Sequence, residues 1–239
     1  MLKLDILALG AHPDDVELSC SGTLIKHAQM GKKVGVVDLT SGQLGTRGNP
    51  VLRIQEAHEA AKIMKLAVRE NLQMEDGFFK NDKEHQLKII EVIRKYKPDV
   101  LLINAPEDRH PDHGRAAQLA KEAAFLSGLA KISSSFNGTA QEAWRPKTVY
   151  NYIQSMYLKP DFIVDISKVM EQKMQAILAY KSQFFDPNSK EENTFISSPE
   201  FLEFIKSRAK ELGQIASCQY AEGFIAQRYL GIEDLTELF

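Results

Sequence analysis

Ala11-His12-Pro13-Asp14-Asp15 marks the point where the first predicted strand of the chain ends and the first predicted helix follows. An apolar run at 4–9 precedes this stretch, and a helical pattern with apolar residues on one face covers 17–30. A second apolar run at 34–39 completes the spacing of a βαβ unit, which predicts a parallel sheet with a right-handed crossover. Ligands bind at the carboxyl ends of strands in such sheets. We therefore expect a functional loop at this first strand end.

The rest of the chain continues the alternation of strands and helices. Further strands are predicted at 66–73, 100–103, 149–153, 162–166 and 219–227. Further helices are predicted at 51–65, 83–96, 113–127, 167–184 (capped by Ser167) and 199–212. Three polar stretches are expected to be loops, at 40–50, 131–147 and 186–198, the last of them mobile at the surface. The pattern predicts an α/β fold with a Rossmann-like, mostly parallel sheet, helices on both faces, and a single domain over 1–239.

Composition narrows the class of protein. The 239 residues are 44% hydrophobic and 26% charged, which is typical of a globular domain, and the net charge of −2 gives no sign of a nucleic-acid or anionic-membrane partner. No apolar run approaches the roughly 18 residues of a membrane span, and no signal peptide is apparent. The two cysteines, Cys20 and Cys218, are too few for a disulfide framework. We expect a cytoplasmic protein without nucleic-acid or membrane partners.

A second polar cluster, Asp108-Arg109-His110-Pro111-Asp112-His113, follows the buried run at 100–103 and leads into a helix, as the first cluster does. Zinc in catalytic sites takes three protein ligands and keeps one position open for water. Within the first cluster, His12 and Asp15 are close enough to bind one ion, which leaves Asp14 free to accept a proton from water. The alternatives are that the acidic pair only caps the following helix, and that the later histidines are only exposed. Because both clusters occupy strand ends, we expect the two loops to meet and hold a catalytic metal.

Together the two clusters resemble the signature pair of the zinc-dependent N-acetylglucosaminyl deacetylases of the PIG-L/LmbE type. The resemblance covers essentially the whole chain and looks most like the bacillithiol branch, which deacetylates N-acetylglucosaminyl malate. It extends through Thr40-Ser41-Gly42, Arg53-Ile54-Gln55-Glu56-Ala57, Arg94-Lys95-Tyr96-Lys97-Pro98-Asp99, Lys159-Pro160-Asp161-Phe162, Gln183-Phe184 and Tyr220-Ala221-Glu222-Gly223-Phe224.

The resemblance implies a role for each residue of the two clusters. His12, Asp15 and His113 match the zinc ligands, and Asp14 matches the general base. His110 matches a second histidine that stabilises the oxyanion or protonates the leaving amine.

Four further residues receive weaker assignments. By resemblance, Arg53 and Arg109 hold the carboxylate or the sugar of the substrate, although an arginine on a helix often serves a solvated face or an ion pair. The shortest form of the family motif has Glu directly after the Asp pair, whereas Val16 intervenes here, so Glu17 is interpreted as structural. Cys20 is interpreted as a small packed residue.

Several alternatives remain open at this level. A His/Asp/His set with water can hold Fe²⁺, Mn²⁺ or Co²⁺ as well as Zn²⁺. The substrate could be another N-acetylated sugar conjugate, or the chain could be a sugar-binding module with a degenerate site. Relatives commonly assemble, so a homo-oligomer is expected.

Overall fold

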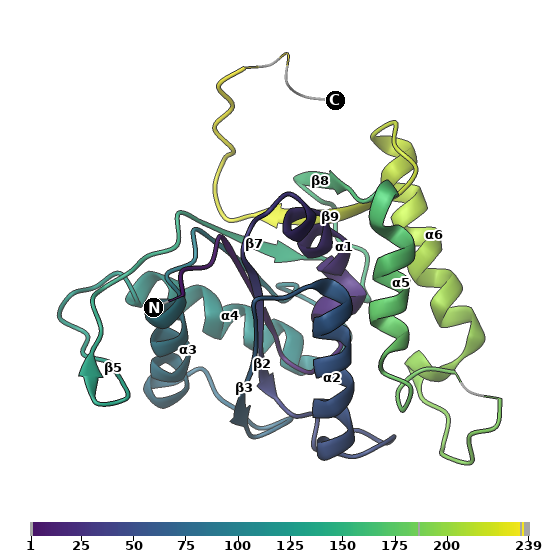
Figure 1. Ribbon diagram of the computed structural model, residues 1–239, viewed down its shortest axis with the longest axis horizontal. Coiled ribbons are helices and arrows are strands. Elements are labelled where there is room, and N and C mark those ends of the chain that lie inside the picture. The colour runs from purple at the N-terminus through teal and green to yellow at the C-terminus, as the bar shows by residue number, and fades with distance from the viewer. Residues whose placement is uncertain (1, 186, 235, 237–239) are drawn as a thin grey trace.

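A computed structural model describes residues 2–185, 187–234 and 236 of the chain, in which a central sheet carries helices on both faces (Figure 1). This arrangement confirms the predicted α/β class. The sheet has seven strands in the order β3-β2-β1-β4-β7-β9-β8, all parallel except β9, which runs antiparallel to both neighbours. These strands are β1 (Ile6–Gly10), β2 (Val34–Thr40), β3 (Val68–Met74), β4 (Val100–Ile103), β7 (Thr148–Tyr152), β8 (Phe162–Asp165) and β9 (Ala221–Ala226).

The helices divide between two hydrophobic clusters, one on each face of the sheet. On one face α1 (Asp15–Gln29), α2 (Pro50–Met64) and α5 (Met170–Leu178) pack together, with α6 (Pro199–Ile215) against β9. On the other face lie α3 (Lys83–Tyr96) and α4 (Pro111–Leu126). Side chains of β1 alternate between the two faces, because Ile6 and Ala8 join the first cluster while Leu7 and Leu9 join the second.

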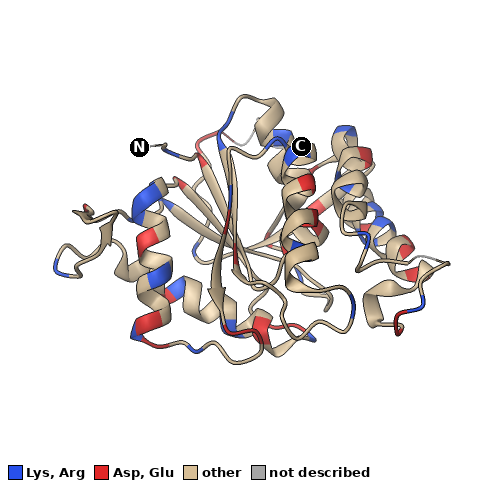
Figure 2. Cartoon of the chain, turned by 60° about the horizontal axis from the view of Figure 1, so that its bottom comes forward, with Lys and Arg blue, Asp and Glu red and all other residues tan. Residues whose placement is uncertain are grey.

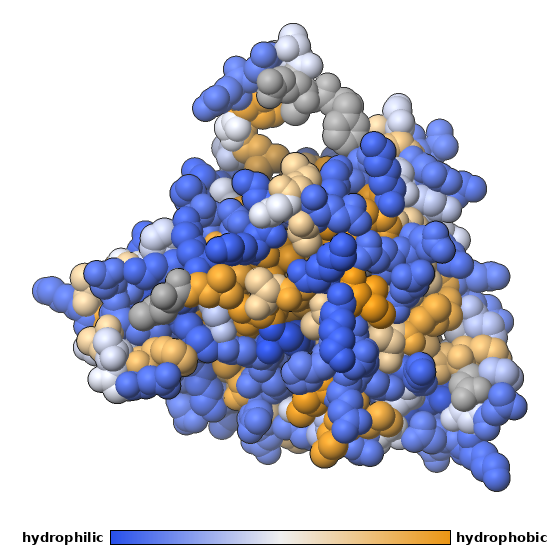
Figure 3. Space-filling model, viewed as in Figure 1, coloured by the Kyte–Doolittle hydropathy of each residue, from blue (hydrophilic) through white to orange (hydrophobic). Residues whose placement is uncertain are grey.

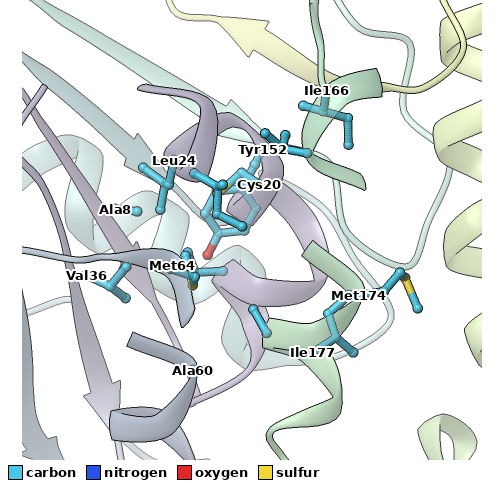
Figure 4. Packing of buried hydrophobic residues seen from close by; sticks show 14 of the residues in the cluster. Ala8, Cys20, Leu24, Val36, Ala60, Met64, Tyr152, Ile166, Met174 and Ile177 are labelled. Atoms are coloured by element: carbon cyan, nitrogen blue, oxygen red, sulfur yellow. The ribbon is translucent and has the colours of Figure 1, made fainter. Parts of the chain in front are cut away.

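The first hydrophobic cluster surrounds α1, the helix that follows the first polar loop. Figure 4 shows Cys20 and Leu24 of α1 beside Tyr152 of β7 and Ile166, all of them buried. Cys20 is thus a packed residue, as expected from the sequence. It also marks a kink in α1, where its backbone leaves the helical conformation (φ −140°, ψ 15°).

Strand order places the two polar loops next to each other. From β1 the chain moves outward through β2 and β3, and then crosses back to β4 on the opposite side of β1. The loops after β1 and β4 therefore leave neighbouring strands at their carboxyl ends and diverge to opposite faces. Such a switch point is where open α/β sheets form a crevice for ligands.

Local structure departs from the sequence-based prediction in four places that bear on the loops and helices around the site. The helix predicted at 167–184 begins as a 3-10 turn (Ser167–Val169) and ends at Leu178, and Ser167 does not cap it because its Oγ donates to Asp165 Oδ1 (2.5 Å). The chain after Leu178 leaves the helix because Ser182 binds the Glu56 carboxylate through both N and Oγ (2.7 Å each).

The other three departures are shorter. The helix predicted from His113 begins at Pro111. The loop at 131–147 contains a hairpin of β5 (Ser135–Phe136) and β6 (Thr139–Ala140), whose Asn137-Gly138 turn has the positive φ angles of the preferred hairpin turn. In the stretch predicted as the loop 186–198, Asp186 lies outside the described residues, and Phe195–Ser197 forms a 3-10 turn, η2.

Acidic and basic residues are mixed along the helices (Figure 2). The face shown in Figure 3 is largely hydrophilic, with hydrophobic residues in between. Among the described residues, none of the helices combines the length and the apolar character needed to cross a bilayer.

Candidate active site

Three histidines from the two polar loops meet at the carboxyl ends of β1 and β4. The ring centroid of His12 lies 4.7 Å from that of His110 and 5.5 Å from that of His113, and the latter two are 5.2 Å apart. His12 and His113 are buried, whereas His110 is half-buried at the rim. The structure thus brings together residues separated by about a hundred positions in the sequence.

Asp15 lies between two of these histidines. Its Oδ1 is 3.0 Å from Nε2 of His113, and its Oδ2 is 3.6 Å from Nδ1 of His12. The other nitrogen of each ring is held by carboxylates: Nε2 of His12 by Asp76 (3.1 Å) and Asp112 (3.3 Å).

His113 follows the same rule, because its Nδ1 is 2.6 Å from Oδ2 of Asp108. Histidines that ligate metals almost always donate their second ring N–H to a carboxylate, carbonyl or water. The donor set of His12, Asp15 and His113 therefore fits a divalent cation, with one nitrogen of each ring directed toward Asp15 and the other fixed from behind.

Among the described residues, two groupings bring one ligand atom of each member within 4.8 Å of the others: His12 with His110 and His113, and His12 with Asp76 and Asp112. The set of His12, Asp15 and His113 is not one of them, so its assignment rests on the contacts of both rings with Asp15. The carboxylates of the second grouping, Asp76 and Asp112, already accept hydrogen bonds from other parts of the chain. Asp112 accepts from Gly77 N (2.8 Å) and Arg115 Nη1 (2.6 Å), and Asp76 accepts from Leu44 N (2.8 Å). These contacts favour an orienting role for both carboxylates over direct ligation.

The electrostatics of the cluster favour positive charge. Burial lowers the pKa of His12, but its hydrogen bonds with Asp112, Asp15 and Asp76 outweigh burial and raise that pKa well above the usual value. Burial also lowers the pKa of His113, but the charge of Asp15 and the hydrogen bonds with Asp108 and Asp15 outweigh burial and raise that pKa to about 9. The local potential is thus strongly negative, as a cation-binding site requires.

Asp15 itself is fixed from the opposite side by two amide side chains. Asn104 Nδ2 donates to Asp15 Oδ2 (3.0 Å) and Gln154 Nε2 donates to Asp15 Oδ1 (3.2 Å). Asn104 follows β4 directly, and Gln154 lies just beyond β7. Sequence reasoning missed both, although a polar residue after a predicted buried strand is the kind of signal that could have found them.

Asp14 is buried beside the cluster, and its carboxylate lines the same cavity as His12, Asp15 and His113. Its φ of 114° is strained for a residue with a side chain, and the carboxylate makes no capping hydrogen bond to α1. Instead Oδ2 accepts from Arg53 Nη2 (2.9 Å), which also donates to Pro13 O (2.7 Å). Burial raises the pKa of Asp14 to about 6, against the opposing charge of Arg53. The cap interpretation of Asp14 is therefore not supported.

Arg53 fits in this position only because Gly42 of the glycine-rich loop has no side chain. A Cβ on Gly42, where φ is +64°, would lie 2.2 Å from Nη1 of Arg53. The loop and the helix α2 thus hold the guanidinium against Asp14. The ion pair between Arg53 and Asp14 is nearly inaccessible to solvent, with both side chains 7% exposed.

His110 caps the helix that carries His113. Its Nδ1 accepts from the backbone N of Asp112 (3.2 Å), so the neutral ring carries its proton on Nε2. Burial and the neighbouring His12 and His113 lower the pKa of His110. The ring is therefore suited to donate a hydrogen bond from Nε2 while neutral.

Glu17 has a structural role, as the sequence suggested. It lies in the first turn of α1 and is fully buried. Its Oε1 accepts from Tyr180 Oη (3.1 Å) and from Arg69, whose guanidinium also binds Asp38.

The cluster opens into a cavity of about 380 Å³. Both predicted substrate-binding arginines line it: Arg53 near Asp14, and Arg109, whose guanidinium lies 4.3 Å above the ring of Phe195. The far wall comes from α6 and from a buried ion pair between Lys173 and Glu222 (2.6 Å), neither of which the sequence had singled out as part of the site.

Comparison with known proteins places this site in a family. Residues 7–124 match the family model described as PIG-L, GlcNAc-PI de-N-acetylase. A conserved protein of known structure from Thermus thermophilus is 34% identical, covers 96% of this chain and 98% of its own, and superposes with a TM-score of 0.85. The diacetylchitobiose deacetylase of Thermococcus kodakarensis is 29% identical over 228 residues, which are 91% of this chain and 81% of that protein.

A more distant relative bears on the branch suggested by the sequence. The probable N-acetyl-α-D-glucosaminyl L-malate deacetylase 2 of Bacillus subtilis is 24% identical over 199 residues, which are 76% of this chain and 84% of that protein. This identity is lower than that of the chitobiose enzyme, so the comparisons do not single out the bacillithiol branch. The family match over 7–124, which contains both histidine loops, and the full-length similarity to the Thermus protein together establish that this chain belongs to the PIG-L family.

Proposed function

We propose that this protein is a metal-dependent N-deacetylase that hydrolyses the acetamide of an N-acetylglucosaminyl conjugate. The observation that carries this proposal is the position of Asp14. It is a buried carboxylate with one oxygen fixed by Arg53, and it lies beside a donor set suited to a divalent cation at the end of a 380 Å³ cavity.

His12, Asp15 and His113 would hold the cation, with zinc as the first expectation and Fe²⁺, Mn²⁺ or Co²⁺ as alternatives. A cation bound there would supply Lewis acidity to the acetyl carbonyl and lower the pKa of a water. The chain's own residues would handle the protons.

Asp14 would accept the proton as water adds to the carbonyl carbon. Arg53 engages Oδ2 (2.9 Å) and thereby orients the carboxylate, which leaves Oδ1 for the water. A buried base with a raised pKa holds this proton long enough to deliver it to the amide nitrogen. The C–N bond then breaks, and acetate and a free amine are released.

His110 would donate from Nε2 to the oxygen that gains negative charge during attack. Its Nδ1 is engaged with the backbone of Asp112, which fixes both the ring and the tautomer. This geometry supports oxyanion stabilisation more directly than delivery of a proton by a cationic ring.

For the substrate we propose N-acetylglucosaminyl malate, as in bacillithiol biosynthesis. Arg109 at the cavity mouth would bind a carboxylate, and Arg53 would contact the sugar or the acid with the part of its guanidinium not engaged by Asp14. The similarity to the chitobiose deacetylase keeps a neutral amino-sugar conjugate as the second candidate.

The test is acetate release from N-acetylglucosaminyl malate by wild type and by Asp14→Asn. Asparagine keeps the volume and can still accept from Arg53, so the variant should retain bound metal, measured by mass spectrometry, and lose nearly all turnover. Retention of most activity would exclude Asp14 as the base. His113→Ala should lower metal content, and unchanged stoichiometry would exclude it as a ligand.

A parallel measurement separates the functional alternatives. Wild type loaded with Zn²⁺ should release acetate from at least one of N-acetylglucosaminyl malate, diacetylchitobiose and N-acetylglucosamine. Binding of these compounds without any acetate release, with metal bound, would favour a sugar-binding module instead.

A further inference from the structure

The cavity extends past the histidine cluster to the helix α6, where a second arginine, Arg208, forms part of the wall. The guanidinium of Arg208 lies 4.5 Å from the ring centroid of Phe204, and its Nη2 donates to Ser155 O (2.7 Å). Phe204 and Ser155 line the same cavity. Arg208 is therefore a half-buried cation on the wall where a substrate would sit.

Arg208 has no carboxylate partner among the described residues, in contrast to Arg53 in the same cavity. Arg53 pairs with Asp14, and Arg115 pairs with Asp112, whereas none of the ion pairs among residues 2–185, 187–234 and 236 includes Arg208. Burial lowers the pKa of Arg208, and the negative charges of Asp108 and Glu211, which raise that pKa, do not offset the effect of burial.

Asp108 cannot serve as the missing partner without leaving its present contacts. Its Oδ2 is engaged by His113 Nδ1 and its Oδ1 by Met156 N, both at 2.6 Å. The half-buried charge of Arg208 thus remains uncompensated within this part of the chain. An anion entering the cavity would relieve that cost.

Arg109 presents the same arrangement from a different element. It comes from the loop after β4, lies over Phe195 at 4.3 Å, and likewise has no ion pair within the described residues. A guanidinium stacked on an aromatic ring keeps its in-plane N–H donors available, and those donors match a carboxylate in bidentate geometry.

We propose that Arg208 is a specificity-determining residue that pairs with a carboxylate on the aglycone of the substrate, on the α6 side of the cavity, while Arg109 serves the loop side. The cavity would then favour N-acetylglucosaminyl conjugates that carry carboxylates over neutral ones. This inference rests on the proposed deacetylase function and adds a residue and a selection rule to it.

A purely structural role for Arg208 makes a different prediction. If the residue served only to link α6 to Ser155, its loss would loosen the cavity wall for every substrate alike. Charge pairing with the aglycone would instead affect only anionic substrates, and mainly through KM, because the aglycone carboxylate does not change during amide hydrolysis.

The experiment compares wild type, Arg208→Met and the control Lys210→Met, which removes an exposed charge from the same helix outside the cavity lining. Methionine keeps the apolar stem that packs near Phe204. Each Zn²⁺-loaded protein is assayed for acetate release from N-acetylglucosaminyl malate and from the methyl glycoside of N-acetylglucosamine, at low and high ionic strength, with a thermal melt to verify folding.

For the malate conjugate we expect kcat/KM of Arg208→Met to fall about 10- to 100-fold, the range for a hydrogen bond to a charged group, mostly through KM. For the methyl glycoside the change should stay below about threefold. The KM of wild type for the malate conjugate should rise with salt more steeply than that of the variant. Lys210→Met should match wild type.

Equal losses on both substrates, or no loss on the malate conjugate, would overturn the role of Arg208. Failure of wild type to release acetate from either compound would instead refute the proposed function. The two failures are therefore distinguishable.

Discussion

Asp108 provides the sharpest test of how the metal ligands are oriented. Its Oδ2 binds Nδ1 of His113 and its Oδ1 accepts from Met156 N, both at 2.6 Å. This pair of contacts keeps a proton on Nδ1 of His113, so Nε2, which faces Asp15 at 3.0 Å, is the nitrogen that releases its proton when a cation binds.

Asp108→Asn keeps the shape of the side chain but supplies only one acceptor. If the amide oxygen accepts from His113, the NH₂ group confronts the N–H of Met156. If the amide is reversed, its NH₂ group faces Nδ1, which moves the ring proton to Nε2 and blocks coordination. Both arrangements weaken cation binding. Loss of such an orienting partner typically lowers metal affinity 10- to 100-fold, or about 1.4 to 2.7 kcal/mol.

The assay is a Zn²⁺ competition titration against a chromophoric chelator, with a urea unfolding curve of the apoprotein to show that the fold is intact. Asp76→Asn is the matched control. His12 Nε2 keeps its contact with Asp112 (3.3 Å) when Asp76 is neutralised, so we expect a smaller loss. Unchanged zinc affinity in Asp108→Asn, alongside reduced affinity in His113→Ala, would refute the assigned tautomer.

Two further predictions concern stability. Arg94 is 1% exposed and donates to Ser127 O, Leu129 O, Ile132 O and Ser134 Oγ, so Arg94→Met should lower the free energy of unfolding by about 3 to 5 kcal/mol by leaving these acceptors unsatisfied. Urea denaturation beside the exposed control Lys121→Met measures this, and a loss below about 1 kcal/mol would contradict it. Burial raises the pKa of Asp38 to about 7, above its unfolded value of about 3.9. Between these two values the folded state holds a proton on Asp38 that the unfolded state has released. The contribution of this group to the free energy of unfolding is therefore lost as pH rises from about 4 to about 7. Asp38→Asn should flatten the fall in unfolding free energy across that pH range, and an unchanged slope would show that Asp38 is ionised in the folded state.

The sequence was sufficient to predict the elements that place the site. Strongly apolar runs such as 100–103, followed by helical patterns, specify strands and helices by local periodicity, and a parallel sheet brings their carboxyl ends to one edge. The prediction failed where tertiary contacts override local preference. The segment after Leu178 favours helix, yet Glu56, more than a hundred residues away, draws Ser182 out of it.

The composition of the candidate site divides in the same way. Motif and spacing were enough to single out the two loops that carry His12, Asp14, Asp15, His110 and His113, because a ligand-rich loop has a local signature, while the role predicted for each residue came from the family resemblance. The contacts that give these residues their separate roles have no such local signature, because they join segments distant in the sequence. Arg53 reaches Asp14 from α2, Asp76 and Asp108 hold the rear nitrogens, and Arg208 enters the cavity from α6.

What the amino-acid sequence determined by itself was therefore the strand-end turn at residues 11–15 and its counterpart at 108–113, together with the sheet that supports them. Only the tertiary structure decided that Asp14 faces Arg53 while Asp15 faces two histidines. The physical reason is that backbone periodicity is encoded over a few neighbouring residues. The orientation and protonation of a buried side chain depend instead on charges and hydrogen bonds that distant segments bring to it.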